Sequence, residues 1–553
     1  MLLARIRNYL AEEEWTFAPH ERASMPGSPA SPEHPLKRRA AYAAIGILVG
    51  ITGGLGNAMI SVNLTTLQGS LGLDPGEIAW LPTAYVMTNT SINLLMIKFR
   101  QQFGLRPFAL IFVTLYALLT FAHLFVRDFS TAIAVRAASG MAGAALSSLC
   151  LYYMMQALPA KWRLKGVVLG IGVPQCAIPL ARLFSPDLLA MSEWRALYLF
   201  ELGLALLSLA AVSLLRLPPA ERQPAFEPMD FVTFALFGGS VALFAAVLGE
   251  GRIVWWTSAP WVGWALVAAI PMFAAAIAIE HNRANPLLNT RWLGSADILR
   301  FAVVTIMARI VLSEQTYGAV GLLTALGQNN DQMQTLFVII LIASIAGVAA
   351  SAITLNVEKL THPVMLSVGL VAIAAFVDSF STSLTRAPEL YVTQGVIAFS
   401  ATFFLGPALL FGMTRALQQG AGHIISFIAL FGIVNSIGGL GGAALLGTYQ
   451  TIAEKSHSAA IVQSITLTDP NVAARISAGG AAVGRVIGDT GLRNAEGAAL
   501  LSQTATREAN VLAFNDVFRL VAVLAALTTA YLAMLLMRRN YRERRAARLE
   551  TVT

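Results

Sequence analysis

Long apolar runs separated by short polar connections fill the sequence from Ala40 to Met537. A helix needs about 20 mostly apolar residues to cross a hydrocarbon core. No run alternates apolar and polar residues as a strand of a membrane barrel would. The pattern therefore predicts an all-α integral membrane protein. A window of about 19 residues predicts about fourteen transmembrane helices, centred near residues 53, 88, 116, 143, 178, 206, 240, 270, 312, 345, 372, 402, 437 and 525.

The composition agrees with a membrane protein, because 56% of the residues are hydrophobic and only 12% are charged. A soluble domain has about 25% charged residues. The net charge of +8 comes from short basic clusters between the apolar runs, so we expect no nucleic-acid surface. Cys150 and Cys176 lie inside apolar runs, which excludes a disulfide framework and a cysteine metal site. We expect no metal and no cofactor.

The basic residues alternate between successive connections, which gives an orientation through the positive-inside rule. Connections such as GSLGLDPGE and NNDQMQT carry no Lys or Arg. The rule places both termini in the cytoplasm. The connections assigned to that side carry Lys37, Arg38, Arg39, Arg100, Arg106, Lys161, Arg163, Lys165, Arg216, Arg222, Arg283, Lys359 and Arg415, and the C-terminal tail contains RRNYRERRAAR.

One connection on the opposite side, residues 451–510, is far longer than the others. It is predicted to hold amphipathic helical segments with polar turns, and a connection of this length is typical of a functional or disordered segment. Its GDTG sequence is not followed by Lys-Ser/Thr, so it indicates a plain turn rather than a phosphate loop. The N-terminal PGSPASPEHP is typical of a flexible linker.

Four sequence segments resemble one family. They are KFRQQFGLRPFAL at 98–110, RAASGMAGAA from Arg136, WRALYLFELG from Trp194 and AFNDVF at 513–518. Together they resemble the major facilitator superfamily, and AFNDVF with the long connection before it is similar to the start of the last helix in fourteen-helix drug:proton antiporters of the EmrB/QacA type. The resemblance implies two six-helix bundles with an extra helix pair. The implied parts are a cytoplasmic tail 1–39, bundles 40–217 and 291–537, the helix pair 218–290, the periplasmic loop 451–510 and a basic tail 538–553.

The resemblance implies a secondary transporter rather than an enzyme. The expected activity is proton-driven export of hydrophobic or amphipathic compounds across a bacterial inner membrane. Its expected partners are small-molecule substrates, protons and the lipid bilayer, with a periplasmic adaptor and an outer-membrane channel implied by the long loop. No GxxxxGKS/T motif occurs, which argues against ATP-driven transport. Two alternatives stay open: an exporter of a dedicated metabolite or organic anion, and a non-transporting receptor or scaffold.

The sequence departs from this family at its coupling motifs. GNAMIS places Gly56 where the first helix of the family carries an Asp. GIGVPQCAIPLARLFSP lacks the closing glycine pair of the antiporter motif, and Gln394-Gly395 stands where an Arg-Gly pair is expected. The proton-coupling carboxylate must therefore lie elsewhere if coupling is retained.

Ionisable residues inside the apolar runs are the candidates for this role, because each costs at least about 2.5 kcal/mol at the centre of a membrane helix. Arg309 and Glu314 lie about 140° apart on a helix, so they do not pair along one face. We expect Glu314, facing a central cavity, to couple protons, with Asp378 and Glu201 as further candidates and Arg136 assisting. The alternative for Glu314 is an ion pair with Arg182 or Arg309 that fixes helix packing; for Arg136 it is a structural role on nearby carbonyls.

A substrate pocket is expected near the bilayer midplane between the two bundles. Arg182 lies among three prolines, which leave backbone carbonyls without their helical N–H donors. We expect Arg182 either to donate to these carbonyls or to bind an anionic substrate. Aromatic candidates either bind substrate or simply pack. The basic loop Arg100, Gly104 and Arg106 is expected to act as a cytoplasmic latch, the alternative being an ordinary positive-inside loop. The pocket candidates are Asn57, Asn63, Tyr85, Asn89, Asn93, Arg182, Arg309, Tyr317, Phe403 and Phe404.

Overall fold

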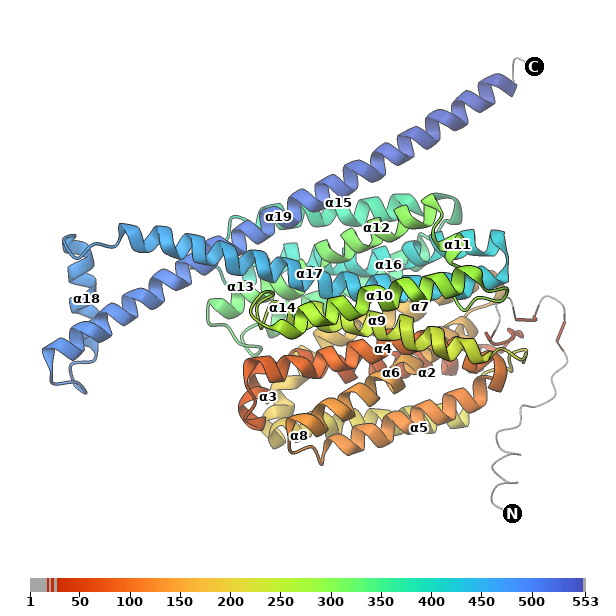
Figure 1. Cartoon of the computed structure of the whole chain (residues 1–553), viewed down its shortest axis with the longest axis horizontal. Coiled ribbons are helices and arrows are strands. Elements are labelled where there is room, and N and C mark those ends of the chain that lie inside the picture. The colour runs from red at the N-terminus through yellow and green to blue at the C-terminus, as the bar shows by residue number, and fades with distance from the viewer. Residues whose placement is uncertain (1–16, 19–20, 24–26, 551–553) are drawn as a thin grey trace.

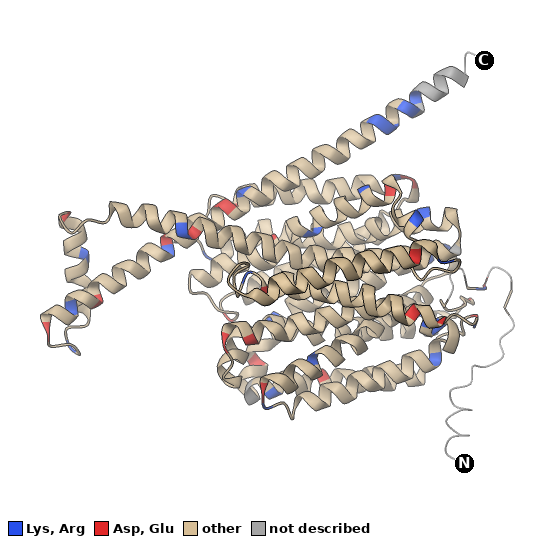
Figure 2. Cartoon of the chain, viewed as in Figure 1, with Lys and Arg blue, Asp and Glu red and all other residues tan. Residues whose placement is uncertain are grey.

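A computed structural model describes residues 17–18, 21–23 and 27–550 of the 553-residue chain. Within those residues, twelve helical stretches are long and apolar enough to cross a membrane, which confirms a multi-pass helical membrane protein. The helices run side by side as one bundle (Figure 1). Most charged residues lie toward the two ends of this bundle (Figure 2). We call the end of the bundle where α2 begins the basic end. We call the opposite end, from which the helices of residues 451–510 extend, the hairpin end.

The first group of helices is held together by α6, which packs against α2, α4 and α5, and by α8, which packs against α2 and α5. α4 begins with a capping box in which Asp74 and Glu77 satisfy each other's backbone N–H groups. Its helices are α2 (Leu36–Ser61), α3 (Leu64–Leu71), α4 (Pro75–Phe103), α5 (Leu105–His123), α6 (Phe129–Ala157), η1 (Ala160–Trp162), α7 (Arg163–Gly172), η2 (Val173–Cys176) and α8 (Ala177–Leu214).

The second group contains the largest buried hydrophobic cluster, to which Phe404, Phe427 and Val521 belong. In it α16 packs against α14 and α15, and α19 packs against α15 and α17. The two groups meet where α7 and α8 contact α14 and α16. Its helices are α11 (Thr290–Leu293), α12 (Ala296–Leu312), η3 (Glu314–Ala319), α13 (Val320–Ala325), α14 (Gln334–Ile353), η4 (Val357–Lys359), α15 (Thr361–Asp378), η5 (Ala387–Leu390), α16 (Tyr391–Gln419), α17 (Ala421–Ser464), α18 (Pro470–Ala482) and α19 (Thr490–Glu550).

An additional helix pair, α9 (Pro228–Glu250) and α10 (Pro260–Asn282), runs alongside the other helices, and α9 contacts both α4 of the first group and α17 of the second (Figure 1). At the basic end Lys98 of α4 pairs with Asp230 at 2.5 Å, and Arg283 pairs with Asp230, Glu227 and Glu280 at 2.6–2.9 Å. The Arg283 hydrogen bond holds the pKa of the exposed Glu227 carboxyl below its usual value. The ion pair between Lys98 and Asp230 therefore holds the helix pair α9–α10 against the first group.

The connection 451–510 forms a helical protrusion made of the last turns of α17, α18 and the first turns of α19 (Figure 1). α18 packs closely on α19, because a Cβ on Gly497 would collide with the carbonyl oxygen of Ile476. Asp489 of GDTG caps α19 by accepting from the Leu492 N–H at 2.9 Å. The motif AFNDVF lies within α19, 23 residues after its first residue Thr490, and not at the start of the last helix as predicted.

The prediction of a flexible N-terminal linker is wrong for residues 27–31, which are buried. The Ala30 N–H donates to the Pro219 carbonyl at 3.0 Å, and its carbonyl accepts from Gln156 at 2.8 Å. His34 makes a further hydrogen bond with Gln156 at 3.0 Å. These backbone contacts hold the segment against the basic end of the first group. The predicted tail also includes residues 1–16, 19–20 and 24–26, which lie outside the described residues.

Candidate functional site

Two carboxylates from different helices share one amide group in the second group. Nε2 of Gln394 in α16 donates to the two oxygens of Glu314 at 3.1 and 3.3 Å and to Asp378 Oδ2 at 2.9 Å. Glu314 and Gln394 are 0% exposed and Asp378 is 2% exposed. Glu314 opens the π-helical turn η3, and such turns occur often at functional sites. The structure thus brings together two of the predicted proton-coupling residues.

The positions of Arg182 and Arg309 contradict the ion-pair interpretation of Glu314. Arg182 donates to Asn330 Oδ1 at 2.8 Å and lies over the ring of Phe337. Arg309 packs against the glycines of α17, because a Cβ on Gly438 would lie 2.7 Å from its Cβ. Among the residues that the structure describes, no Lys or Arg forms an ion pair with Glu314 or Asp378. Within the described part of the chain, the two carboxylates are therefore held together by Gln394 and not by a Lys or Arg.

The burial of Glu314 also differs from the expectation of a side chain facing an open cavity, since none of its surface is exposed in this conformation. Gly318, four residues after Glu314, lies where there is no room for a side chain. A Cβ at Gly318 would lie 2.9 Å from the ring of Phe518 in α19 and 3.4 Å from Cγ of Glu314. Close packing by η3 and α19 therefore seals this side of the carboxylate.

A third buried carboxylate, Glu201, lies in the first group. The hydroxyl of Tyr116 in α5 donates to Glu201 Oε1 at 2.6 Å, and Thr120 adds a contact at 3.5 Å. A Cβ on Gly56 would lie 2.9 Å from this oxygen and would collide with the Tyr116 hydroxyl. Gly56, where the resembling family carries an Asp, thus leaves the space that Glu201 and Tyr116 fill. A carboxylate is present beside this position, but α8 supplies it.

Arg136 of α6 lies next to this carboxylate and is 1% exposed. It donates to the carbonyls of Leu81 at 3.2 Å and Gly56 at 2.8 Å and to Asn57 Oδ1 at 2.7 Å, and it lies over the ring of Tyr85 at 4.7 Å. These contacts fit the structural role that was the alternative for Arg136. They also occupy two predicted pocket residues, Asn57 and Tyr85.

Other predicted pocket residues are engaged within the helix packing. Asn63 donates to Ser185 at 2.6 Å, Asn89 to the Gly140 carbonyl at 3.0 Å and Asn93 to the Asn89 carbonyl at 2.9 Å. Tyr317 contacts Gln450 at 3.5 Å, and Phe403 stacks on Phe399 while Phe404 is fully buried. Packing or a local hydrogen bond therefore accounts for each of these six side chains in this conformation.

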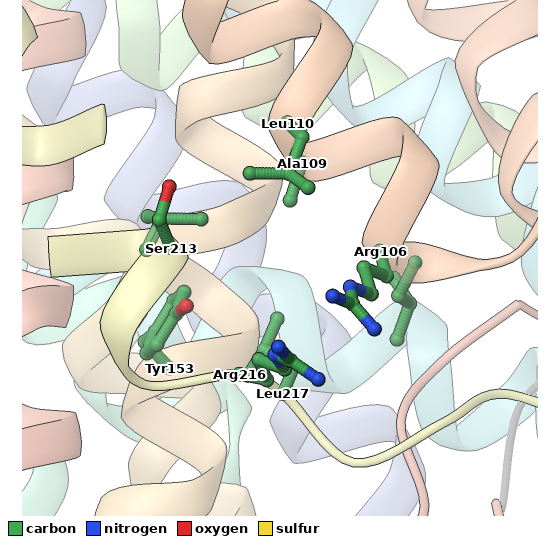
Figure 3. Close-up of a pocket in the computed structure, with 9 residues that line it drawn as sticks. Arg106, Ala109, Leu110, Tyr153, Ser213, Arg216 and Leu217 are labelled. Carbon is green, nitrogen blue, oxygen red and sulfur yellow. The ribbon is translucent and has the colours of Figure 1, made fainter. Parts of the chain in front are cut away.

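The basic loop between α4 and α5 is ordered by Gly104, whose φ of 87° lies in the region that glycine tolerates best. Arg100 is buried between the rings of Phe108 and Tyr152, with distances of 5.3 and 5.1 Å to the ring centres. Arg106 lines a small pocket at the basic end together with Arg216 (Figure 3). Arg100 thus contacts aromatic faces in this conformation, and the latch stays a prediction.

Two residues of these buried clusters did not stand out in the sequence. Gln394 was noted only as a departure from a motif, although a single amide within the apolar run of α16 is itself a signal for a buried polar partner. Glu250 stands at the end of an apolar run, where a charged residue is a weak signal, yet it is 0% exposed. The described residues contain no group of three or more His, Cys, Asp or Glu able to hold a metal ion.

Comparisons with known proteins agree on the fold. The family model described as Major Facilitator Superfamily matches residues 46–444. No curated protein matches the sequence. Similar solved structures include the human organic anion transporter MFSD10 (TETRAN), with a TM-score of 0.52, 14% identity and coverage of 89% of this chain and 100% of that one. A bacterial homologue of the human peptide transporters PepT1 and PepT2 gives 0.51 at 13% identity, covering 91% and 99%, and the POT family transporter PepTSo gives 0.52 at 12%, covering 91% and 99%.

Proposed function

The chain belongs to the major facilitator superfamily, and we propose that it is a proton-driven exporter of hydrophobic or amphipathic compounds. The supporting observation is the sharing of one Gln394 amide by Glu314 and Asp378. Two ionised carboxylates placed together in a low-dielectric interior repel each other strongly, so such a pair favours the binding of a proton. A pair held without a cation is free to exchange that proton against a cationic substrate.

The proposed cycle uses the two groups of helices as the two halves of an alternating-access transporter. Protons bind to the Glu314–Asp378 pair when it opens toward the hairpin end. When the pair opens toward the basic end, a lipophilic cation displaces the proton and the carboxylates offset its charge. The Gln394 amide donates to both carboxylates, and it holds them in place as their protonation changes.

The proposed topology has fourteen transmembrane helices. Beside the twelve apolar stretches, α4 and the continuous segment formed by α12, η3 and α13 pack within the bundle. The positive-inside rule puts the basic end in the cytoplasm of a bacterial cell, with both termini there. The helical protrusion would then extend into the periplasm, where its exposed faces could meet an adaptor and, through it, an outer-membrane channel.

The alternative of organic-anion export is less favoured, because the Arg182 guanidinium donates to Asn330 and lies over the ring of Phe337 in this conformation. Export of cationic compounds is favoured by the excess of buried carboxylates in the second group. The scaffold alternative would require no proton-binding pair, so the test of the pair also tests that alternative.

The test uses purified protein in liposomes that contain a pH dye, challenged with tetraphenylphosphonium and, separately, with an organic anion. The wild type is expected to move protons only with the cation, and Glu314→Gln is expected to abolish that movement. Glu389→Gln is a matched control, because Glu389 is exposed at the hairpin end. Proton movement with the anion alone, or undiminished movement in Glu314→Gln, would contradict the proposal.

A further inference from the structure

Glu250, the last residue of α9, is a buried carboxylate that the proposed cycle does not use. It is 0% exposed, and neither of its oxygens has a hydrogen-bond partner in the part of the chain that the structure describes. An ionised carboxylate without donors in a protein interior is costly, because it has lost its hydration and gained nothing in return. Glu201, by contrast, receives a donor at 2.6 Å.

The groups that act on the Glu250 carboxylate are the nearby Thr83 hydroxyl of α4 and the positive charge of Arg252. Its helix neighbour Gly249 packs on Thr83 of α4, whose Oγ1 would lie 2.5 Å from a Cβ at Gly249, and this hydroxyl donates to the Ala79 carbonyl. The titratable groups that face this region are Arg252 from the α9–α10 connection, Tyr317 from η3 and Lys455 from α17. Arg252 lies over the Tyr317 ring at 5.1 Å and forms no ion pair with Glu250 among the described residues.

The connection that follows Glu250 turns tightly at its backbone carbonyl, which accepts from the N–H groups of Ile253 and Val254 at 2.8 and 3.0 Å, and it is strained one residue later. Trp255 has a φ of 62°, a conformation that bulky residues rarely adopt. Trp256 packs against Gly251, where a Cβ would collide with its ring, and its Nε1–H donates to Thr448 of α17 at 2.8 Å. Strain of this kind persists where the surrounding structure enforces it, and it is found often at functional sites.

The contacts of this connection reach from the first group to the second. Glu250 packs with α4, whereas Trp256 and Arg252 contact α17 and η3. A movement of the second group against the first would therefore pull the connection away from Glu250. We propose that Glu250 is a third proton-binding site, covered in this conformation by the connection 251–259 and exposed to the hairpin side when the two groups move apart.

This inference rests on the proposed alternating access, but the protonation of Glu250 can be measured independently of transport. Infrared spectroscopy of the purified protein at neutral pH should show a carboxylic-acid C=O band that is lost in Glu250→Gln and kept in the matched control Glu389→Gln. A spectrum of Glu250→Gln that instead loses ionised carboxylate absorbance would overturn the proposal.

The cover is tested by transfer into D2O, where exchange of the acid proton shifts the same band. Trp256→Phe keeps an aromatic side chain but loses the indole N–H that donates to Thr448, so we expect the band to shift about fivefold faster than in wild type. Trp264→Phe, on the exposed face of α10, is the matched control. Equal exchange rates in the wild type and Trp256→Phe would show that the connection does not cover Glu250. Failure of the export proposal would appear in the liposome flux and would leave this band unchanged.

Discussion

The two groups of helices bury carboxylates in different ways. In the first, Glu201 has its own hydroxyl donor, Tyr116, and Arg136 lies nearby on the carbonyl of Gly56. In the second, Glu314 and Asp378 compete for one amide, and no described cation pairs with them. A carboxylate with its own hydrogen-bond donor is held in one position. Two carboxylates that share a donor repel each other when both are ionised, which favours the binding of a proton. We therefore propose that the first cluster holds its helices together and that the second exchanges protons.

The largest expected effect is the loss of coupling in the second group. Asp378→Asn should reduce cation-driven proton flux to the level of protein-free liposomes, because the remaining carboxylate no longer has a like-charged neighbour that favours protonation. The purified variant should keep the elution profile of the wild type. Flux equal to that of wild type would remove Asp378 from the exchanging pair.

A second large effect is expected at Gln394. Gln394→Leu leaves two buried carboxylates without their shared donor, and hydrogen bonds to charged groups are worth about 1.5–3 kcal/mol each. We expect a lower melting temperature in detergent and a proton flux whose pH dependence differs from that of wild type. Gln315→Leu is a fair control, since the Gln315 side chain donates to the backbone carbonyl of Gln394 at 3.0 Å and to neither carboxylate among the described residues. An unchanged pH dependence would mean that the amide does not control the pair.

The first group should respond through packing. Gly56→Ala places a methyl group against the Tyr116 hydroxyl and Glu201, and overpacking of this kind costs about 1–3 kcal/mol. We therefore expect Gly56→Ala to lower the melting temperature. Tyr116→Phe removes the clashing hydroxyl, so the double variant should recover part of this loss. If the two substitutions were simply additive, the described contact would not be the cause.

The smallest effect is the pH dependence that the exposed Glu227 gives to the charged cluster that fastens α9 and α10 at the basic end. Arg283 lowers the pKa of Glu227 from its usual 4.5, so the stabilisation is complete above that value and is lost as pH falls through the lower pKa of the folded protein. The melting-temperature difference between wild type and Arg283→Gln should therefore shrink below about pH 4.5. Arg300→Gln removes an exposed pair and should show little difference at any pH.

The helices were predictable because their apolar runs are long and uninterrupted, and Glu314 and Asp378 were predictable because charges in such runs are costly. The sharing of the Gln394 amide by these two carboxylates was not predictable, because Gln394 is 80 residues from Glu314 along the chain and no local pattern joins them. Residues 27–31 were misread for a related reason. Pro and Ser composition is typical of a linker, but hydrogen bonds to Pro219 and Gln156 order this segment.

The most direct test of the central claim is the number of protons released when tetraphenylphosphonium binds to the purified protein in weakly buffered detergent. The wild type should release protons on binding, and the double variant Glu314→Gln, Asp378→Asn should bind without releasing them, while Glu201→Gln should still release them. Equal release by the wild type and the double variant would contradict the assignment of proton exchange to the Glu314–Asp378 pair.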